Sequence, residues 1–189
     1  MLSSLNNKNP KIREKLLNPF LININPNIVT VIALIVAVIA GIFFYYGELL
    51  FALIFVLLNG FLDILDGQIA KKYKRTTKLG DFLDHTADRI ADVAILLGIT
   101  LSAYVVDVYG YALIIATLLT SYLGTQAQAL TNKRIYGGLI GRSDRLILIA
   151  IFVILEFIYP GALYDGILVL LLLTIITFIQ RFIKIWKVL

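Results

Sequence analysis

Residues 28–46 read IVTVIALIVAVIAGIFFYY, an apolar run without a charged side chain. Coiled as an α-helix at about 1.5 Å per residue, this run is roughly 28 Å long and nearly spans the ~30 Å hydrocarbon core of a bilayer. A second run of the same kind, GILVLLLLTIITFI, occupies residues 166–179. Because the chain is 60% hydrophobic and only 15% charged, we predict an all-α integral membrane protein.

Six apolar segments follow one another along the chain, and short turns with Gly, Pro or acidic residues separate several of them. We predict a transmembrane helix for each segment, at about 28–46, 49–70, 82–106, 110–131, 143–159 and 163–182. An even number of crossings puts both ends of the chain on the same side of the membrane.

The 17 Lys and Arg residues all fall on one side of this predicted bundle. They precede the first segment, lie around the second-to-third and fourth-to-fifth connections, or lie at the end of the sixth segment. The opposite turns and their flanks carry acidic residues instead, namely Glu48, Asp107, Glu156 and Asp165. Basic loops remain in the cytoplasm. We therefore expect a multi-pass protein of the cell (plasma) membrane with both termini and its basic face on the cytoplasmic side.

The N-terminal region has a different pattern. Residues 5–21 combine apolar side chains with several charged ones, which predicts an amphipathic helix lying in the inner membrane interface. A disordered basic tail is the alternative for residues 1–9. We accordingly expect two parts, an N-terminal interfacial segment at residues 1–26 and a six-helix transmembrane domain at residues 27–189.

A cluster of acidic residues interrupts the apolar pattern between the second and third segments. The stretch DILDGQIAKKYKRTTKLGDFLDHTAD, residues 63–88, holds five carboxylates. Asp63 and Asp66 are three residues apart and share one helix face. On the next predicted helix, steps of 3, 4 and 4 residues confine four carboxylates to one arc: Asp81, Asp84, Asp88 and Asp92.

Carboxylates gathered beside lipid need compensating cations. The chain has no cysteine and a single histidine, so the cluster offers mainly oxygen ligands and favours Mg²⁺ or Mn²⁺ over zinc or copper. Two clusters on facing helices suit a pair of ions that stabilise phosphoryl transfer. The alternative is an acidic interfacial surface that the lysines of the connecting loop neutralise.

The spacing forms a motif, Asp63-x2-Asp66-Gly67-x2-Ala70-Lys71-x8-Gly80-x3-Asp84-x3-Asp88. The motif resembles the signature of the CDP-alcohol phosphotransferases, integral membrane enzymes that make phospholipids from CDP-linked lipids. Lys71 stands where that family usually has Arg, which keeps the charge but loses the guanidinium fork. The sequence NPNIVT at residues 25–30 also resembles the segment that opens the family's first helix.

The resemblance implies a role for each matching position. Two Mg²⁺ (or Mn²⁺) ions would be held by Asp63, Asp66, Asp84 and Asp88. Asp88 would also be the general base that takes the proton from the acceptor hydroxyl. The CDP-lipid would bind to Asn27, Ile28, Val29, Thr30, Gly67, Ala70, Lys71, Thr77 and Gly80. Outside the motif, we expect His85 to support helix packing or the site's carboxylates rather than the chemistry.

The resemblance also implies a homodimer. Small residues allow transmembrane helices to approach one another closely. Four of them are candidates for a helix interface: Gly98, Ser102, Gly124 and Ala127.

A second basic cluster bears on the acceptor alcohol. It lies in TNKRIYGGLIGRSDR, residues 131–145, whose last part resembles the inositol-phosphate branch of the family. Because Arg binds phosphate through a fork of donors, we expect an acceptor that itself carries phosphate. It would bind to Lys133, Arg134, Arg142, Arg145 and Arg181. Plain cytoplasmic topology is the alternative explanation for this cluster.

The expected reaction transfers a phosphatidyl-type group to inositol 1-phosphate and releases CMP. The group would be archaetidyl if the donor is CDP-archaeol, and CDP-diacylglycerol is the other donor. Glycerol 3-phosphate is the alternative acceptor. A cation transporter is the alternative class, because carboxylates also line ion pathways, although the outer halves of the helices carry almost no polar residues. We expect membrane lipid around the protein and no nucleic-acid partner.

Overall fold

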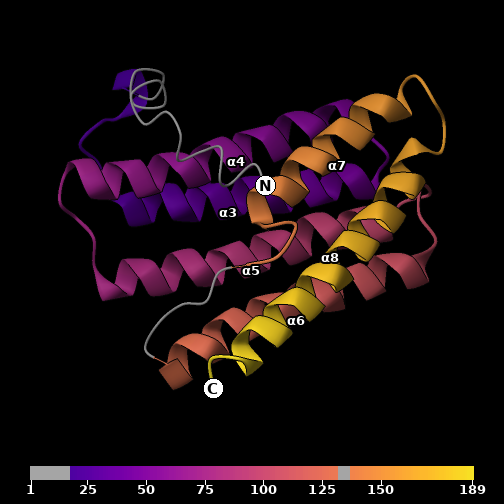
Figure 1. The fold of residues 1–189 in the computed structure, drawn as a ribbon. Helices are drawn as coiled ribbons and strands as arrows, with labels where there is room; N and C mark the ends of the chain where they lie inside the picture. Colours follow the sequence, from indigo (N-terminus) through magenta and orange to yellow (C-terminus); the bar gives the residue numbers. More distant parts are fainter. Residues whose placement is uncertain (1–17, 132–136) are drawn as a thin grey trace.

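The computed structural model describes residues 18–131 and 137–189, and the regular structure within these two ranges is entirely helical. A short 3₁₀ helix, η1, comes first. Six α-helices follow (Figure 1), and the helices span η1 (Asn18–Phe20), α3 (Pro26–Tyr45), α4 (Leu49–Lys72), α5 (Lys78–Thr100), α6 (Asp107–Thr131), α7 (Arg142–Glu156) and α8 (Ala162–Trp186). The predicted all-α fold is confirmed. The amphipathic helix predicted for residues 5–21 lies almost wholly outside the described residues.

Side-chain caps begin two of the helices at the same end of the bundle. Asn25 accepts a hydrogen bond from the backbone N–H of Asn27 (3.1 Å), and Pro26 occupies the first turn of α3, where a missing N–H costs nothing. Thr77 caps α5 in the same way by accepting from the N–H of Gly80 (2.9 Å). The sequence therefore fixes where α3 and α5 start.

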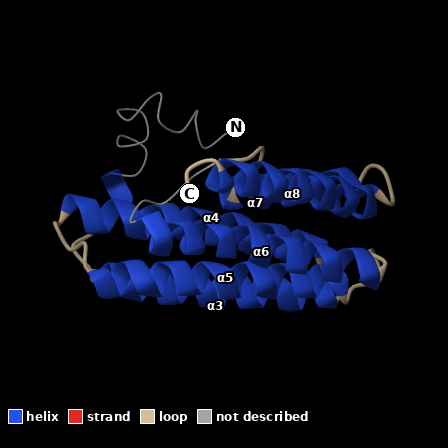
Figure 2. Ribbon diagram, turned by 60° about the horizontal axis from the view of Figure 1, so that its bottom comes forward, coloured by secondary structure: helices blue, strands red, loops and turns tan. Residues whose placement is uncertain are grey.

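The six α-helices form a closed ring. Going around it, α3 packs on α4, α4 on α7, α7 on α8, α8 on α6, α6 on α5, and α5 on α3. Successive helices alternate in direction (Figure 1), and they lie roughly parallel to one axis (Figure 2). At one end of the bundle lie the α4–α5 connection, the end of α6, the start of α7 and the C-terminus, and at the opposite end lie the connections α3–α4, α5–α6 and α7–α8 (Figure 1).

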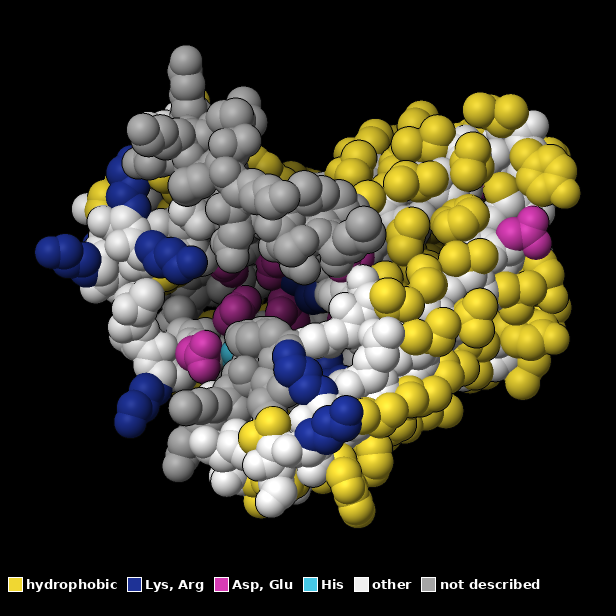
Figure 3. All heavy atoms as spheres, viewed as in Figure 1, with side chains coloured by type: hydrophobic (Ala, Val, Ile, Leu, Met, Phe, Trp, Pro, Cys, Tyr) yellow, Lys and Arg dark blue, Asp and Glu magenta, His cyan; other side chains and the backbone are white. Residues whose placement is uncertain are grey.

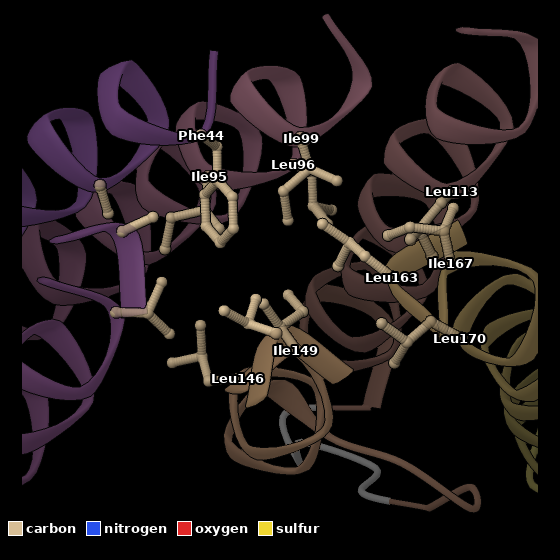
Figure 4. Close-up of a cluster of buried hydrophobic side chains, with 14 of the residues drawn as sticks. Phe44, Ile95, Leu96, Ile99, Leu113, Leu146, Ile149, Leu163, Ile167 and Leu170 are labelled. Atoms are coloured by element: carbon tan, nitrogen blue, oxygen red, sulfur yellow. The ribbon is translucent and has the colours of Figure 1, made fainter. Parts of the chain in front are cut away.

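Apolar side chains from several helices fill the ring at the end opposite the C-terminus. Figure 4 shows them pointing toward one another. The largest fully buried ones include Phe44, Ile95, Ile99, Ile149, Leu163 and Ile167. Lipid tails are as apolar as these side chains, so close packing rather than removal from water stabilises this region. At Gly98 the backbones of α5 and α3 are in direct contact, since an added Cβ would collide with the main chain of Gly41.

Four of the described helices, α3, α4, α6 and α8, are long and apolar enough to cross a membrane. Helix α5 carries the acidic cluster in its first half, and α7 has 15 residues, about 22 Å of helix. Large apolar side chains cover much of the outer surface, while Lys and Arg gather toward the end that holds the C-terminus (Figure 3). The chain is a multi-pass membrane protein.

The small residues considered for a dimer interface are used inside the chain. Gly98, Ser102, Gly124 and Ala127 are all buried within the bundle. The Ser102 hydroxyl, for example, donates to the carbonyl of Ile99 (2.6 Å). Of the four, Gly98 and Gly124 line pockets of the bundle, and the role of these residues in a dimer stays a prediction.

Candidate active site

The acidic cluster lies inside the ring, between the apolar core and the basic end. Figure 3 looks into a hollow at this end, with acidic side chains inside it and basic ones around it. One small space, about 10 Å³, is lined by all four carboxylates of the motif: Asp63 and Asp66 from α4, and Asp84 and Asp88 from α5. The ring thus brings together residues that the sequence places on two helices.

The residues around this space fit a divalent cation. Asp84 and Asp88, which line this space, and His85, which does not, each present one ligand atom within 4.8 Å of the others. The hydroxyl of Thr30 donates to Oδ2 of Asp66 (2.6 Å), which fixes the orientation of that carboxylate. Mg²⁺ and Mn²⁺ prefer carboxylate oxygens as ligands, and a hydrogen bond to a ligating carboxylate holds it in the orientation for binding.

A guanidinium reaches the same carboxylates. Nη1 of Arg142, at the start of α7, lies 2.5 Å from Oδ1 of Asp63 and 2.8 Å from Oδ1 of Asp88. Its Nη2 donates to the side-chain oxygen of Asn59 (3.4 Å). Sequence reasoning placed Arg142 with the acceptor phosphate and missed these contacts, because they depend on how α7 packs against α4.

A pocket of about 190 Å³ opens beside Asp66 and Asp84. Seven of the residues predicted to bind the CDP-lipid line it: Asn27, Thr30, Gly67, Ala70, Lys71, Thr77 and Gly80. Ile28 and Val29, which were predicted to bind as well, do not. The turn of α3 directs Ile28 to the outer surface, where it is 54% exposed, and Val29 into a buried cluster with Leu21 and Ile69.

This first pocket suits an anion that comes close to the backbone. The N-terminal turns of α3 and α5 border it, as do the side chains of Lys71 and Arg75. A Cβ added to Gly67 would meet no protein atom within 4 Å, so the missing side chain leaves free room in the pocket. A Cβ on Gly80 would lie 3.2 Å from Oδ1 of Asn27, so there the glycine allows the two helix starts to meet.

A second pocket, about 260 Å³, lies on the other side of Asp88. Three residues predicted to bind the acceptor phosphate, Arg142, Arg145 and Arg181, line it together with Asp88. The other two, Lys133 and Arg134, lie outside the described residues. His85 also lines this pocket, and its Nε2 is 3.4 Å from Oδ1 of Asp81.

The arginines of the second pocket are held in place by specific partners. Nη2 of Arg145 lies 2.5 Å from Oδ2 of Asp92, and both side chains are buried. Arg181 donates through Nη1 to the carbonyl of Thr120 (2.6 Å) and through Nε and Nη2 to the carbonyl of Gly137 (3.3 and 3.2 Å). These contacts orient both guanidiniums.

Several lining residues of the second pocket were missed by sequence reasoning. They are Arg89 on α5 and three hydroxyl-bearing residues on α6: Thr117, Thr120 and Ser121. Thr120 and Ser121 follow Thr117 by 3 and 4 residues, so all three share one face of α6. That polar stripe was the available signal. For Arg89 the signal was its position next to Asp88, but the sequence analysis used this arginine only for topology.

Comparison with known proteins identifies the family. A model of the CDP-alcohol phosphatidyltransferase family matches residues 23–186. The archaetidylinositol phosphate synthase of Pyrococcus horikoshii is 32% identical over 160 residues, which cover 85% of this chain and 82% of that protein. The archaetidylinositol phosphate synthase of Methanothermobacter thermautotrophicus is 31% identical over 188 residues, 98% of this chain and 95% of that one.

The fold matches a solved structure as well. The crystal structure of Mycobacterium tuberculosis phosphatidylinositol phosphate synthase with CDP-DAG bound has a TM-score of 0.80 and 26% identity, covering 92% of this chain and 91% of that chain. The same protein in complex with manganese and citrate has a TM-score of 0.79, with 26% identity over 93% and 88% of the two chains. The chain therefore belongs to the CDP-alcohol phosphatidyltransferase family and is a transferase of phospholipid biosynthesis.

Proposed function

We propose that this enzyme transfers the phosphatidyl-type group of a CDP-linked lipid to a hydroxyl of inositol 1-phosphate and releases CMP. The observation that carries the proposal is that two pockets meet at one carboxylate cluster. The first pocket reaches Asp66 and Asp84, and the second reaches Asp88. A donor in one pocket and an acceptor in the other would face each other across these side chains, as a direct transfer requires.

The first pocket is the proposed CDP-lipid site. Lys71, Arg75 and the two helix N-termini would attract the diphosphate. Asn27, Thr30, Gly67, Ala70, Thr77 and Gly80 would form its remaining wall. The CDP-DAG bound to the M. tuberculosis relative supports a CDP-lipid here. The two archaetidylinositol phosphate synthases favour archaeol as the lipid of this donor.

Two divalent cations, Mg²⁺ or Mn²⁺, would be held by Asp63, Asp66, Asp84 and Asp88. Bound there, they would neutralise the diphosphate and make CMP a better leaving group. The manganese complex of the M. tuberculosis relative supports a divalent metal.

Asp88 is the proposed general base. Asp88 lines both the carboxylate space and the second pocket. Among the described residues, the other three carboxylates of the motif do not line the second pocket. A base needs only hydrogen-bond reach to the hydroxyl whose proton it takes. The acceptor oxygen would then attack the lipid-linked phosphorus, and the bond from that phosphorus to CMP would break.

The second pocket is the proposed acceptor site. Arg142, Arg145 and Arg181 would bind the phosphate of the acceptor, with Lys133 and Arg134 as further predicted contacts. The opposite wall carries the hydroxyls of α6. Oγ1 of Thr117 is buried and has no hydrogen-bond partner among the described residues, so it is available to a hydroxyl of the acceptor. A polar wall of this kind favours inositol phosphate over the smaller glycerol 3-phosphate.

All six α-helices are proposed to cross the membrane, with an interfacial helix at the N-terminus. The alternation of helix direction supports this, as does the concentration of basic residues at one end. The active site and both termini would then be cytoplasmic. The apolar core at the other end argues against a cation transporter, because its described residues include the fully buried, apolar side chains of Phe44, Ile95 and Ile99. The homodimer stays a prediction.

The test is CMP release by purified protein supplied with Mg²⁺ and CDP-archaeol. Inositol 1-phosphate and glycerol 3-phosphate are offered in separate reactions at equal concentration. We expect a kcat/KM at least about tenfold higher for inositol 1-phosphate, the discrimination that one well-placed hydroxyl contact gives. A higher kcat/KM for glycerol 3-phosphate would overturn the proposed acceptor, and no release with either would overturn the reaction.

A further inference from the structure

Asp92 is a buried carboxylate that the family motif does not include. It lies one helical turn beyond Asp88 on α5 and is only 4% exposed. It does not line the carboxylate space that fits the cations. A buried carboxylate is costly unless charged partners surround it, so its neighbours indicate what it does.

Three guanidiniums converge on Asp92. Nη2 of Arg145 lies 2.5 Å from Oδ2, and Nε of Arg142 lies 3.4 Å from Oδ1. Nη1 of Arg89, one turn earlier on the same helix, is 3.8 Å from Oδ2. All three arginines line the second pocket, whereas Asp92 stands behind them.

The arrangement solves an electrostatic problem. Guanidiniums gathered around a pocket of about 260 Å³ repel one another, and the repulsion is strong where water is scarce. A buried carboxylate in contact with two of them offsets that repulsion. The carboxylate also restricts the rotamers of the arginine side chains, so less conformational entropy is lost when an anion binds.

The other carboxylates that contact Arg142 cannot serve this purpose when cations are bound. Asp63 and Asp88 are proposed metal ligands, and a cation would compete with Arg142 for their oxygens. Asp92 belongs to neither the motif nor the metal space. It is therefore the carboxylate whose contact with the arginines does not depend on the metal.

We propose that Asp92 is a positioning residue of the acceptor site, holding the guanidiniums of Arg142 and Arg145 toward the second pocket so that they bind the acceptor's phosphate. The inference rests on the proposed function for the location of the acceptor. It goes beyond that function by assigning the preorganisation of the phosphate site to a residue that touches neither substrate.

The first test is Asp92→Asn, which keeps the shape and removes the charge. We expect the KM for inositol 1-phosphate to rise roughly 10- to 100-fold, the usual effect of losing a partner that orients a binding group. The KM for the CDP-lipid and the equilibrium affinity for Mn²⁺, read by electron paramagnetic resonance, should stay within about twofold. Asp92→Glu, which keeps the charge, should recover part of the loss. Asp165→Asn, at an exposed position in the first turn of α8, is the matched control and should change none of these values.

The second test is a double-mutant cycle with Arg145→Gln. Because Asp92 contacts Arg142 as well as Arg145, we expect the variant carrying both changes to have an acceptor KM above that of Arg145→Gln alone, with an increase smaller than the product of the two single increases. The double variant removes both charges of the buried Asp92–Arg145 pair. It can therefore still be measured if Asp92→Asn alone leaves Arg145 without its partner and impairs folding. An unchanged acceptor KM in Asp92→Asn would overturn the inference. So would equal increases for both substrates, or a double variant whose KM increase is the product of the two single increases.

The two proposals fail in different ways. If the wild type uses glycerol 3-phosphate and not inositol 1-phosphate, the proposed acceptor is wrong. The same shift in KM for glycerol 3-phosphate would still support the role of Asp92.

Discussion

Nη1 of Arg142 lies 2.8 Å from the carboxylate of Asp88, so the proposed phosphate-binding arginine touches the proposed general base. The two side chains come from α7 and α5, which are far apart in the sequence. Their contact marks the point where the acceptor pocket meets the carboxylate space. An acceptor whose phosphate binds Arg142 would therefore hold its hydroxyl close to Asp88. Binding of the acceptor's phosphate would thus place its hydroxyl where Asp88 can take the proton.

Asp88→Asn should nearly abolish turnover while sparing the fold. The amide has the same shape as the carboxylate but cannot take the acceptor's proton, so we expect kcat to fall by about 10²- to 10⁴-fold. Binding of the CDP-lipid, measured by equilibrium titration, should persist because the first pocket does not include Asp88. Full activity of this variant in the CMP-release assay would rule out the base assignment.

Thr30→Val should weaken metal binding. It removes the hydroxyl that donates to Asp66 (2.6 Å) and leaves the side-chain volume almost unchanged. Losing a hydrogen bond behind a metal ligand costs roughly 10- to 100-fold in metal affinity. The readouts are Mn²⁺ titration and the metal concentration at half-maximal activity. Thr174→Val is the control, because the buried hydroxyl of Thr174 on α8 has no partner among the described residues. Equal affinities for all three proteins would show that Asp66 does not hold the ion.

Lys71→Gln should raise the KM for the CDP-lipid by about tenfold, the effect of losing one charge-assisted contact worth roughly 1.5 kcal/mol. Lys71→Arg should retain the affinity, since the family motif usually has Arg at this position. The neighbouring Lys72→Gln is the control, because Lys72 donates to Asn18 (3.2 Å) and does not line the pocket. A KM that responds equally to both Gln substitutions would contradict a specific role for Lys71.

Thr117→Val should reduce the preference for inositol 1-phosphate over glycerol 3-phosphate. Removing one hydroxyl contact to the acceptor should lower the ratio of the two kcat/KM values by about 3- to 10-fold. Stability should hold or improve slightly, because the wild-type hydroxyl is buried without a partner among the described residues. An unchanged ratio would remove Thr117 from acceptor recognition.

The apolar pattern predicted the helices well where it was uninterrupted. The first segment was expected at 28–46, and α3 spans Pro26–Tyr45. The third was expected at 82–106, whereas α5 spans Lys78–Thr100. Its start is set by the polar cap at Thr77, which hydropathy does not detect. Apolar residues continue past its end into a turn, so hydropathy alone could not show where α5 stops.

The site was predictable where one helix carries the information. The spacing of Asp84 and Asp88 fixes a shared face whatever the neighbours do. The contact of Arg142 with Asp63 could not be predicted, because it requires knowing that α7 packs on α4 in the ring. Ile28 and Val29 show the same limit, since the motif segment is continuous in sequence but a helix turns each successive side chain by about 100°.

The most direct test of the central claim is a competition assay read by mass spectrometry of the lipid product. Purified protein receives Mg²⁺ and CDP-archaeol with inositol 1-phosphate and glycerol 3-phosphate at equal concentration. We predict that archaetidylinositol phosphate is the main product and that CMP forms in equal amount. A product that contains glycerol phosphate, or CMP formed without either lipid, would contradict the account.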